Sequence, residues 1–259
     1  MDRPYHRRFS GDSQAFAVRV GAEWAGSIGV IERTNRDFLL GLRQQLPPIL
    51  AQLFPYPLAT LGRDFHVVAV LHEVFHAYQA MQAPTRFASA QAGYSAQDRY
   101  PCNDAGFAAA WDKEGGLLAA ALKAADDGEA RGFGRRFLQA RESRRAEAAL
   151  DPTLLAFERG LEWLEGLAKY AEIRFYELAA SSTSHVGPNS IRYRSGLPYW
   201  QGEFKRLDGG LSREDGDYRF YLSGMAQARL LDRLSPDWKR EAMRDGVYLE
   251  DVLRRAVGL

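Results

Sequence analysis

The sequence is short of cysteine, of long apolar runs and of net charge. Its one cysteine, Cys102, excludes an intrachain disulfide. No run of about 18 apolar residues is present, so we expect no membrane-spanning helix. The 34 basic and 33 acidic residues leave a formal net charge of +1. A protein with so little net charge has no overall field to attract nucleic acid or an anionic membrane, and we predict no nucleic-acid partner.

The chain is large enough to bury a full hydrophobic core. It has 259 residues, of which 46% are hydrophobic and 26% charged, as in ordinary globular proteins. We predict one domain over residues 1–259, with an N-terminal lobe of about 1–83 and a helical lobe of about 84–259. Residues 1–8 are not followed by an apolar stretch of signal-peptide length. A cytoplasmic protein is therefore expected if the chain is complete, and an exported one if a leader has been removed.

Hydrophobic spacing predicts an α+β protein that is mainly α. Residues 15–20 alternate as in a half-buried strand, and the short apolar run 27–31 predicts a second strand. Residues 84–110 and 181–216 are rich in Gly, Ser and Pro and are interpreted as connections. Helices are expected at 36–45, 64–82, 113–125, 134–149, 151–180, 217–234 and 247–257, with a short one from Pro236.

An arginine cluster occupies the helix expected at 134–149. The spacing favours a solvated face whose charges pair with Glu142 and Glu147. The alternative is that the arginines bind an acidic ligand. The cluster comprises Arg135, Arg136, Arg141, Arg144 and Arg145.

The pattern His-Glu-x-x-His appears at His72, Glu73 and His76. It lies within a helix expected to begin at Asp64, a favourable N-cap, and to end before Pro84. Apolar residues surround the motif almost completely, which predicts a buried helix. The motif is typical of the zinc helix of metallopeptidases.

The spacing of the motif explains its chemistry. Residues i and i+4 lie one turn apart on the same helix face, so His72 and His76 can bind one Zn²⁺ ion. Glu73 lies beside the metal, where it can take a proton from a water molecule as the general base. A catalytic zinc site needs a third protein ligand. His6, near the N-terminus, and His66, off the motif face, are poorly placed to supply it.

The helix expected at 151–180 offers better candidates for the third ligand. Glu158, Glu162, Glu165 and Glu172 recur at helical spacing on one face. The same spacing also fits a solvated acidic stripe. From the residues alone, both Glu165 and Glu162, one turn earlier, remain candidates.

Residues 164–172 read Leu-Glu-Gly-Leu-Ala-Lys-Tyr-Ala-Glu. This segment resembles the Asn-Glu-Gly-Phe-Ala-x-Tyr-x-Glu segment of gluzincin peptidases, the aminopeptidase-N-like and glycyl-aminopeptidase-like families. The resemblance implies a zincin-like metallopeptidase fold and makes Glu165 the third zinc ligand. Leu164 replaces the asparagine of those families, which has little bearing on the ligand itself.

A second resemblance to the same families begins at Tyr221. The segment Tyr-Leu-Ser-Gly-Met-Ala-Gln-Ala-Arg-Leu-Leu-Asp is similar to their Tyr-x-Lys-Gly-x-x-x-x-x-Leu-Leu-Asp helix start, with Ser223 in place of lysine. It implies that the Tyr221 hydroxyl stabilises the oxyanion of a tetrahedral intermediate. Tyr218 and His185 are the alternatives for this role, because either could donate to an oxyanion. Tyr221 could also be a core aromatic.

Two departures limit what the resemblance implies. The Gly-Ala-Met-Glu-Asn segment that anchors the substrate amine in aminopeptidase-N-like enzymes is missing, so we do not predict an aminopeptidase. The helices at 113–149 form an insert before Glu165. We therefore predict a zinc metallopeptidase of unknown specificity, with one Zn²⁺ ion per chain and a peptide or protein substrate. The alternatives are a zinc hydrolase of an ester, amide or epoxide, and a non-catalytic zincin-like binding protein.

Overall fold

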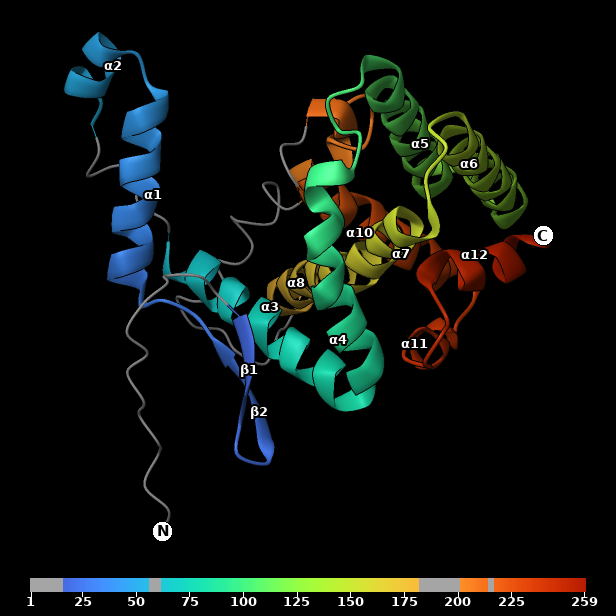
Figure 1. Cartoon of the computed structure of the whole chain (residues 1–259), viewed down its shortest axis with the longest axis horizontal. Coiled ribbons are helices and arrows are strands. Elements are labelled where there is room, and N and C mark those ends of the chain that lie inside the picture. Colours follow the sequence, from blue (N-terminus) through green and yellow to red (C-terminus); the bar gives the residue numbers. More distant parts are fainter. Residues whose placement is uncertain (1–15, 56–61, 182–200, 214–216) are drawn as a thin grey trace.

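The computed structural model describes residues 16–55, 62–181, 201–213 and 217–259. In these residues, helices surround a long central helical run, and one two-stranded antiparallel sheet lies near the N-terminal end (Figure 1). The prediction of a mainly helical α+β protein is confirmed. No helix in the described part of the chain is both long enough and apolar enough to cross a membrane.

The sheet is a hairpin of β1 (Phe16–Val20) and β2 (Glu23–Ser27). Phe16 pairs with Ser27, and Gly21 makes the tight turn in the left-handed region, with φ of 64°. The second strand was predicted at 27–31, which is wrong. The turn contains only two residues, so the second strand begins at Glu23, which pairs with Val20. Ile31 instead begins the first helix.

The helices that lie wholly within the described residues follow in chain order. They are α1 (Ile31–Gln45), α2 (Pro48–Leu53), α3 (Arg63–Gln82), α4 (Pro84–Gly93), the 3₁₀ helix η2 (Tyr94–Arg99), α5 (Ala105–Lys123), α6 (Asp127–Glu147), α7 (Pro152–Leu161), the π-helical segment η3 (Glu162–Gly166), α8 (Leu167–Ser181), the 3₁₀ helix η4 (Leu211–Arg213), α10 (Tyr218–Leu234), α11 (Trp238–Ala242) and α12 (Leu249–Val257).

Three of these helices correct the sequence prediction. Residues 84–110 are not a plain connection, because Pro84 occupies the first turn of α4, where its missing N–H costs nothing. Helix α5 begins at Ala105, ahead of the predicted residue 113, because the Asp104 carboxylate caps it by accepting a hydrogen bond from the Phe107 amide. Helix α6 likewise begins at Asp127 rather than at Gly134, with Asp126 as its cap.

Helix α3, which carries the His-Glu-x-x-His motif, begins at Arg63 with Gly62 as its N-cap, so the predicted cap at Asp64 is wrong. The helix is also not buried all round. The hairpin, α4 and α8 cover one side of it, while the side chains of Val74 and Tyr78 are 50% and 44% exposed. Strand β2 approaches the motif itself, because a Cβ atom on Gly26 would lie 2.8 Å from the Glu73 carbonyl carbon.

The central run consists of α7, the π segment and α8, and it fits the helix predicted at 151–180. Asp151 caps it as predicted, by accepting a hydrogen bond from the Leu154 amide at 2.9 Å. Helices α3 and α10 both pack against this run. Trp163 of the π segment is fully buried and donates a hydrogen bond to the Ala242 carbonyl. The central run therefore positions side chains toward both neighbouring helices.

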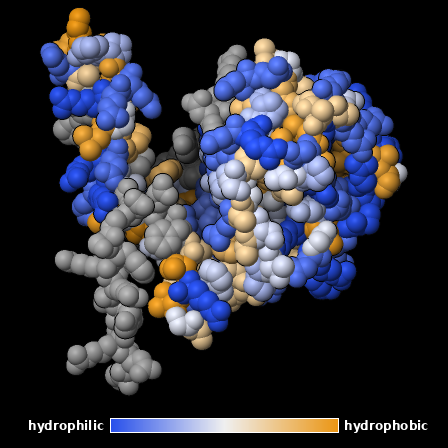
Figure 2. Space-filling view, in the orientation of Figure 1, coloured by the Kyte–Doolittle hydropathy of each residue, from blue (hydrophilic) through white to orange (hydrophobic). Residues whose placement is uncertain are grey.

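An arm made of α1 and α2 projects away from this body (Figure 1). Neither helix has a buried residue. Hydrophobic residues lie at the outer end of the arm (Figure 2), where Ile49 and Leu53 are 74% and 76% exposed. The described core is accordingly built from α3 onward.

The prediction of a solvated arginine face is wrong for Arg141 and Arg144, because both side chains are fully buried. Arg141 donates to Glu162 and Glu114, and Arg144 donates to Glu158. Their partners come from α5, α7 and the π segment, so the arginines join helices that are distant in sequence. The acidic stripe is likewise not solvated, since each of its four members is buried: Glu158, Glu162, Glu165 and Glu172.

This network predicts a large cost for removing one of its charges. Burial raises the pKa of Glu158, but Arg144 and Arg145 outweigh it and hold the pKa well below its usual range. Glu158→Gln leaves buried arginines without compensation and should lower the free energy of unfolding by about 3 to 5 kcal/mol. The exposed Glu147→Gln is the control. Urea unfolding at pH 7 measures both variants.

The pH dependence of the same experiment follows from the sign of the shift. A carboxyl with a depressed pKa stabilises the fold above its unfolded pKa, near 4.5, and loses that contribution as the pH falls through its folded pKa. The difference between wild type and Glu158→Gln should therefore shrink as the pH falls below that value. An unfolding free energy equal to that of Glu147→Gln at pH 7 would contradict this account.

Candidate metal centre

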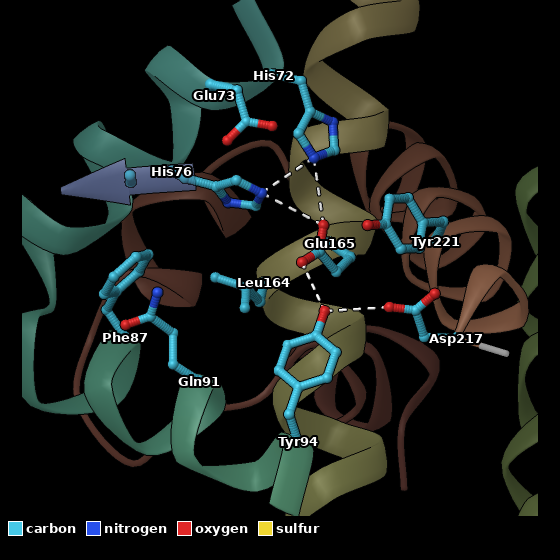
Figure 3. A pocket seen from close by; sticks show the side chains of 11 residues that line it. His72, Glu73, His76, Phe87, Gln91, Tyr94, Leu164, Glu165, Asp217 and Tyr221 are labelled. Carbon is cyan, nitrogen blue, oxygen red and sulfur yellow. Dashed lines mark hydrogen bonds and ion pairs between the residues drawn. The ribbon is translucent and has the colours of Figure 1, made fainter. Parts of the chain in front are cut away.

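The candidate site residues come from three helical elements that line one cavity of about 540 Å³ (Figure 3). Helix α3 contributes His72, Glu73 and His76, the π segment contributes Glu165, and α10 contributes Tyr221. All five candidate site residues of the preferred sequence interpretation therefore line the same cavity. Its volume falls in the range of small-ligand pockets.

The two histidines and Glu165 converge on one point. His72 Nε2 lies 3.0 Å from His76 Nε2 and 3.2 Å from Glu165 Oε2, and His76 Nε2 lies 3.3 Å from the same oxygen. The ligand atoms all lie within 4.8 Å of one another, and all three residues are buried. One ion could contact all three atoms.

The opposite ring nitrogens are held by outer partners. His72 Nδ1 lies 2.6 Å from Glu172 Oε1, and Lys169 donates a hydrogen bond to the other oxygen of Glu172. His76 Nδ1 lies 2.8 Å from Gln79 Oε1. Such partners fix the tautomer and the orientation of metal-binding imidazoles. Gln79 was not predicted, although its spacing of three residues from His76 places it on the same helix face.

Hydrogen-bond accounting favours a cation at the point of convergence. The Gln79 amide nitrogen donates to the carbonyls of Trp163 and Leu164, so its oxygen accepts from His76 Nδ1. An ionised Glu172 accepts only, so the hydrogen of a neutral His72 lies on Nδ1. Both unprotonated Nε2 atoms then face a carboxylate oxygen with no donor hydrogen among them.

Either a proton or a metal ion removes this mismatch. Burial lowers the pKa of His72, but hydrogen bonds and charge from Glu165 and Glu172 outweigh it and raise the pKa to about 10. Hence a proton on His72 would satisfy the cluster without a metal, and a metal ion that bound there would have to displace it. The donor set of two imidazoles and one carboxylate suits a divalent transition metal.

The π segment separates the two candidate third ligands. Glu165 faces the histidines, whereas the Glu162 carboxylate accepts hydrogen bonds from Arg141 at 2.7 Å and from Ser223 at 2.6 Å. Single π-helical turns inside α-helices often occur at functional sites. The segment also lies unusually close to α10, because a Cβ atom on Gly166 would come within 2.5 Å of the Gly224 Cα atom.

Glu73 lines the cavity without binding the histidines. Its side chain is 8% exposed, and its Oε2 atom is buried with no hydrogen-bond partner. Burial raises the pKa of the Glu73 carboxyl, against the opposing effect of the histidine charges. A carboxylate with a raised pKa is a stronger base than one in water, which suits proton transfer.

Tyr221 lies over the cavity from α10, and its hydroxyl points toward Glu165 (Figure 3). Its ring stacks on His72 with centroids 5.8 Å apart. Burial and the Glu165 charge raise the pKa of Tyr221, so the phenol stays protonated and can donate. Tyr218, the alternative, is occupied by a 2.6 Å hydrogen bond to Glu203.

The remaining candidates do not join the site in the described chain. His66 lies on α3 but does not line the cavity. His6 and His185 lie outside the described residues.

Two titratable residues of the cavity, Tyr94 and Asp217, were not among the predicted site residues. Tyr94 lies in the segment interpreted as a connection, and Asp217 directly precedes α10. The Tyr94 hydroxyl lies 2.9 Å from Glu165 Oε1 and 3.1 Å from Asp217 Oδ2. No sequence pattern links these positions, because only the tertiary fold brings them together.

No protein-family model, curated protein or solved structure matches this chain. The gluzincin resemblance thus rests on the sequence segments and remains a prediction.

The close contact of the π segment with α10 yields a prediction. In Gly166→Ala the new methyl group meets backbone atoms of α10, so the π segment must shift and displace Glu165. We expect a lower melting temperature and on the order of tenfold weaker binding of Co²⁺, as when the surroundings of metal ligands are disturbed. Competition with a chromophoric chelator measures the affinity.

Gly132→Ala is the matched control. A Cβ atom at Gly132 meets nothing within 4 Å, so alanine should stabilise α6 by up to about 1 kcal/mol. The explanation of the glycine contact is wrong if Gly166→Ala keeps the wild-type melting temperature and Co²⁺ affinity.

Proposed function

We propose that the protein is a zinc-dependent hydrolase, specifically a metallopeptidase with a gluzincin-like site in a zincin-like fold. The ion would be held by His72, His76 and Glu165. The observation that carries the proposal is the convergence of one nitrogen from each histidine and one Glu165 oxygen, all within 4.8 Å of one another, beside a buried Glu73 oxygen with no hydrogen-bond partner. A purely structural zinc site has four protein ligands and no need of a base.

Zinc would suit this donor set, because two imidazoles and one carboxylate are typical of catalytic rather than structural zinc sites. When bound, zinc would supply a Lewis acid that makes water a stronger nucleophile near neutral pH. Glu172 and Gln79 keep both Nε2 atoms directed at the ion site and prevent the rings from rotating away.

Glu73 is the proposed general base. Glu73 lines the cavity, and its Oε2 atom has no hydrogen-bond partner, so the carboxylate can accept a proton from water. The protonated carboxyl can then pass this proton to the nitrogen of the departing amine. The surrounding burial, which raises the pKa of Glu73, supports both steps because it stabilises the protonated form.

Tyr221 is the proposed oxyanion donor. Its phenol remains protonated, and its hydroxyl lies on the cavity side of α10 next to Glu165. A hydrogen-bond donor held in a fixed position stabilises negative charge that develops on a carbonyl oxygen. Stacking on both His72 and Tyr218 restricts the tilt of its ring.

Substitution of the proposed base tests this assignment. Glu73→Gln removes the proton acceptor but none of the three metal ligands, so zinc content should stay unchanged while peptide hydrolysis falls at least about 100-fold. Hydrolysis of a quenched-fluorescence peptide library and elemental analysis provide the two readouts.

Glu147→Gln, an exposed change of the same kind, should match the wild type in both readouts. Full hydrolytic activity in Glu73→Gln would end the proposal. Cleavage of small esters without cleavage of any peptide would keep the zinc hydrolase and reject the peptidase.

A further inference from the structure

We propose that Asp217 and Tyr94 form a subsite for a positively charged group of the substrate, an ammonium or a guanidinium. The inference rests on the proposed function, because the subsite belongs to the same cavity. It assigns a substrate class that neither the motif nor the resemblance supplies.

Among the described residues, the cavity wall carries carboxylates but no lysine or arginine. The three carboxylates are those of Glu73, Glu165 and Asp217. A divalent ion would balance the charges of Glu165 and Glu73. The charge of Asp217 then remains, inside a cavity of about 540 Å³ where water screens it less than at the surface.

The Asp217 side chain lines the cavity and does not cap its own helix. It occupies the N-cap of α10, where an aspartate usually accepts a hydrogen bond from the first turn. Its side chain makes no such bond and reaches the Tyr94 hydroxyl at 3.1 Å. No ion pair involves Asp217 in the described residues, so its charge lacks a cationic partner there.

The Tyr94 hydroxyl does not satisfy Asp217 by itself. It has one hydrogen and lies between two carboxylates, with Glu165 Oε1 slightly nearer at 2.9 Å. When this hydrogen is donated to Glu165, no other side chain among the described residues donates to Asp217, whose carboxylate keeps only its own backbone N–H. A substrate N–H group would fill the position with a charge-assisted hydrogen bond.

Two further observations point to a ligand in this cavity. The buried Oε2 atom of Glu73, on another wall, also has no partner. Burial and the nearby charge of Glu165 raise the pKa of Asp217, as expected for a carboxylate without a neighbouring cation in the part of the chain that the structure describes. The positive charge of a bound ammonium group would oppose both causes and stabilise the ionised form of Asp217.

The opposite side of the cavity is different. Phe87 and Gln91 of α4 lie there, away from Asp217 (Figure 3). Charge recognition is therefore confined to one end, and the other end suits an uncharged group. The cavity thus favours substrates with a cationic group on one side of the scissile bond only.

The cationic group has two possible sources, the amino terminus of a peptide or a lysine or arginine side chain. A set of hexa-alanine amides separates them. One pair has a free or an acetylated amino terminus. In the other peptides, all acetylated, a single lysine or its uncharged analogue norleucine is moved through each position. The zinc-loaded full-length protein is assayed for kcat/KM with each peptide.

The cationic member of at least one pair should be preferred, on the order of tenfold or more, as for one charge-assisted hydrogen bond. In Asp217→Asn this ratio should fall to about one. A ratio within one variant does not depend on the fraction of folded protein. The control is Asp237→Asn, which removes a charge at another helix N-cap without a capping bond and should keep the wild-type ratio.

Calorimetry with zinc-loaded Glu73→Gln separates this inference from the proposed function, because binding needs no hydrolysis. Tighter binding of the cationic peptide, lost in Glu73→Gln/Asp217→Asn, supports the subsite even if the wild-type protein cleaves nothing. Cleavage or binding without a preference for the cationic peptide overturns it. A preference that persists in the Asp217→Asn variants overturns it as well.

Discussion

The structure depends on bringing three hydrogen-bond acceptors together in a buried place. His72 Nε2, His76 Nε2 and Glu165 Oε2 lie within about hydrogen-bond distance of one another, although the segments that carry them are far apart in the chain. Such an arrangement is unfavourable unless a cation lies among the three atoms. The outer partners Glu172 and Gln79 hold the rings in this arrangement, so the surrounding fold positions the acceptors where an ion could bind.

The scaffold behind Glu165 explains how that position is maintained. The π segment directs Glu162 toward Arg141 and Glu165 toward the histidines. Glu162 therefore belongs to the buried ion pairs of the core, and Glu165 belongs to the candidate metal site. Arg141 also contacts Glu114 of α5. The close approach of Gly166 to Gly224 fixes the segment against α10, which carries Tyr221. The buried ion pairs and the candidate site therefore share one structural element.

Much of this could be predicted from local patterns, and the errors have a common cause. Helical spacing and the Asp151-Pro152 start located the central run, and the motif with its downstream segment named residues that the fold brings together. The burial of Arg141 could not be predicted, because the glutamates that pair with it come from distant segments of the chain. Tyr94 and Asp217 escaped notice for the same reason, since their contact with each other exists only in the tertiary fold.

The most direct test of the central claim is the metal content of protein purified without added metal. Elemental analysis should find about one equivalent of zinc per chain, because a cluster of three converging acceptors retains a divalent ion. Both His76→Ala and Glu165→Ala should lose that zinc, since each removes one acceptor atom. Wild-type protein that contains no metal, and whose melting temperature does not rise when zinc is added, would contradict the account.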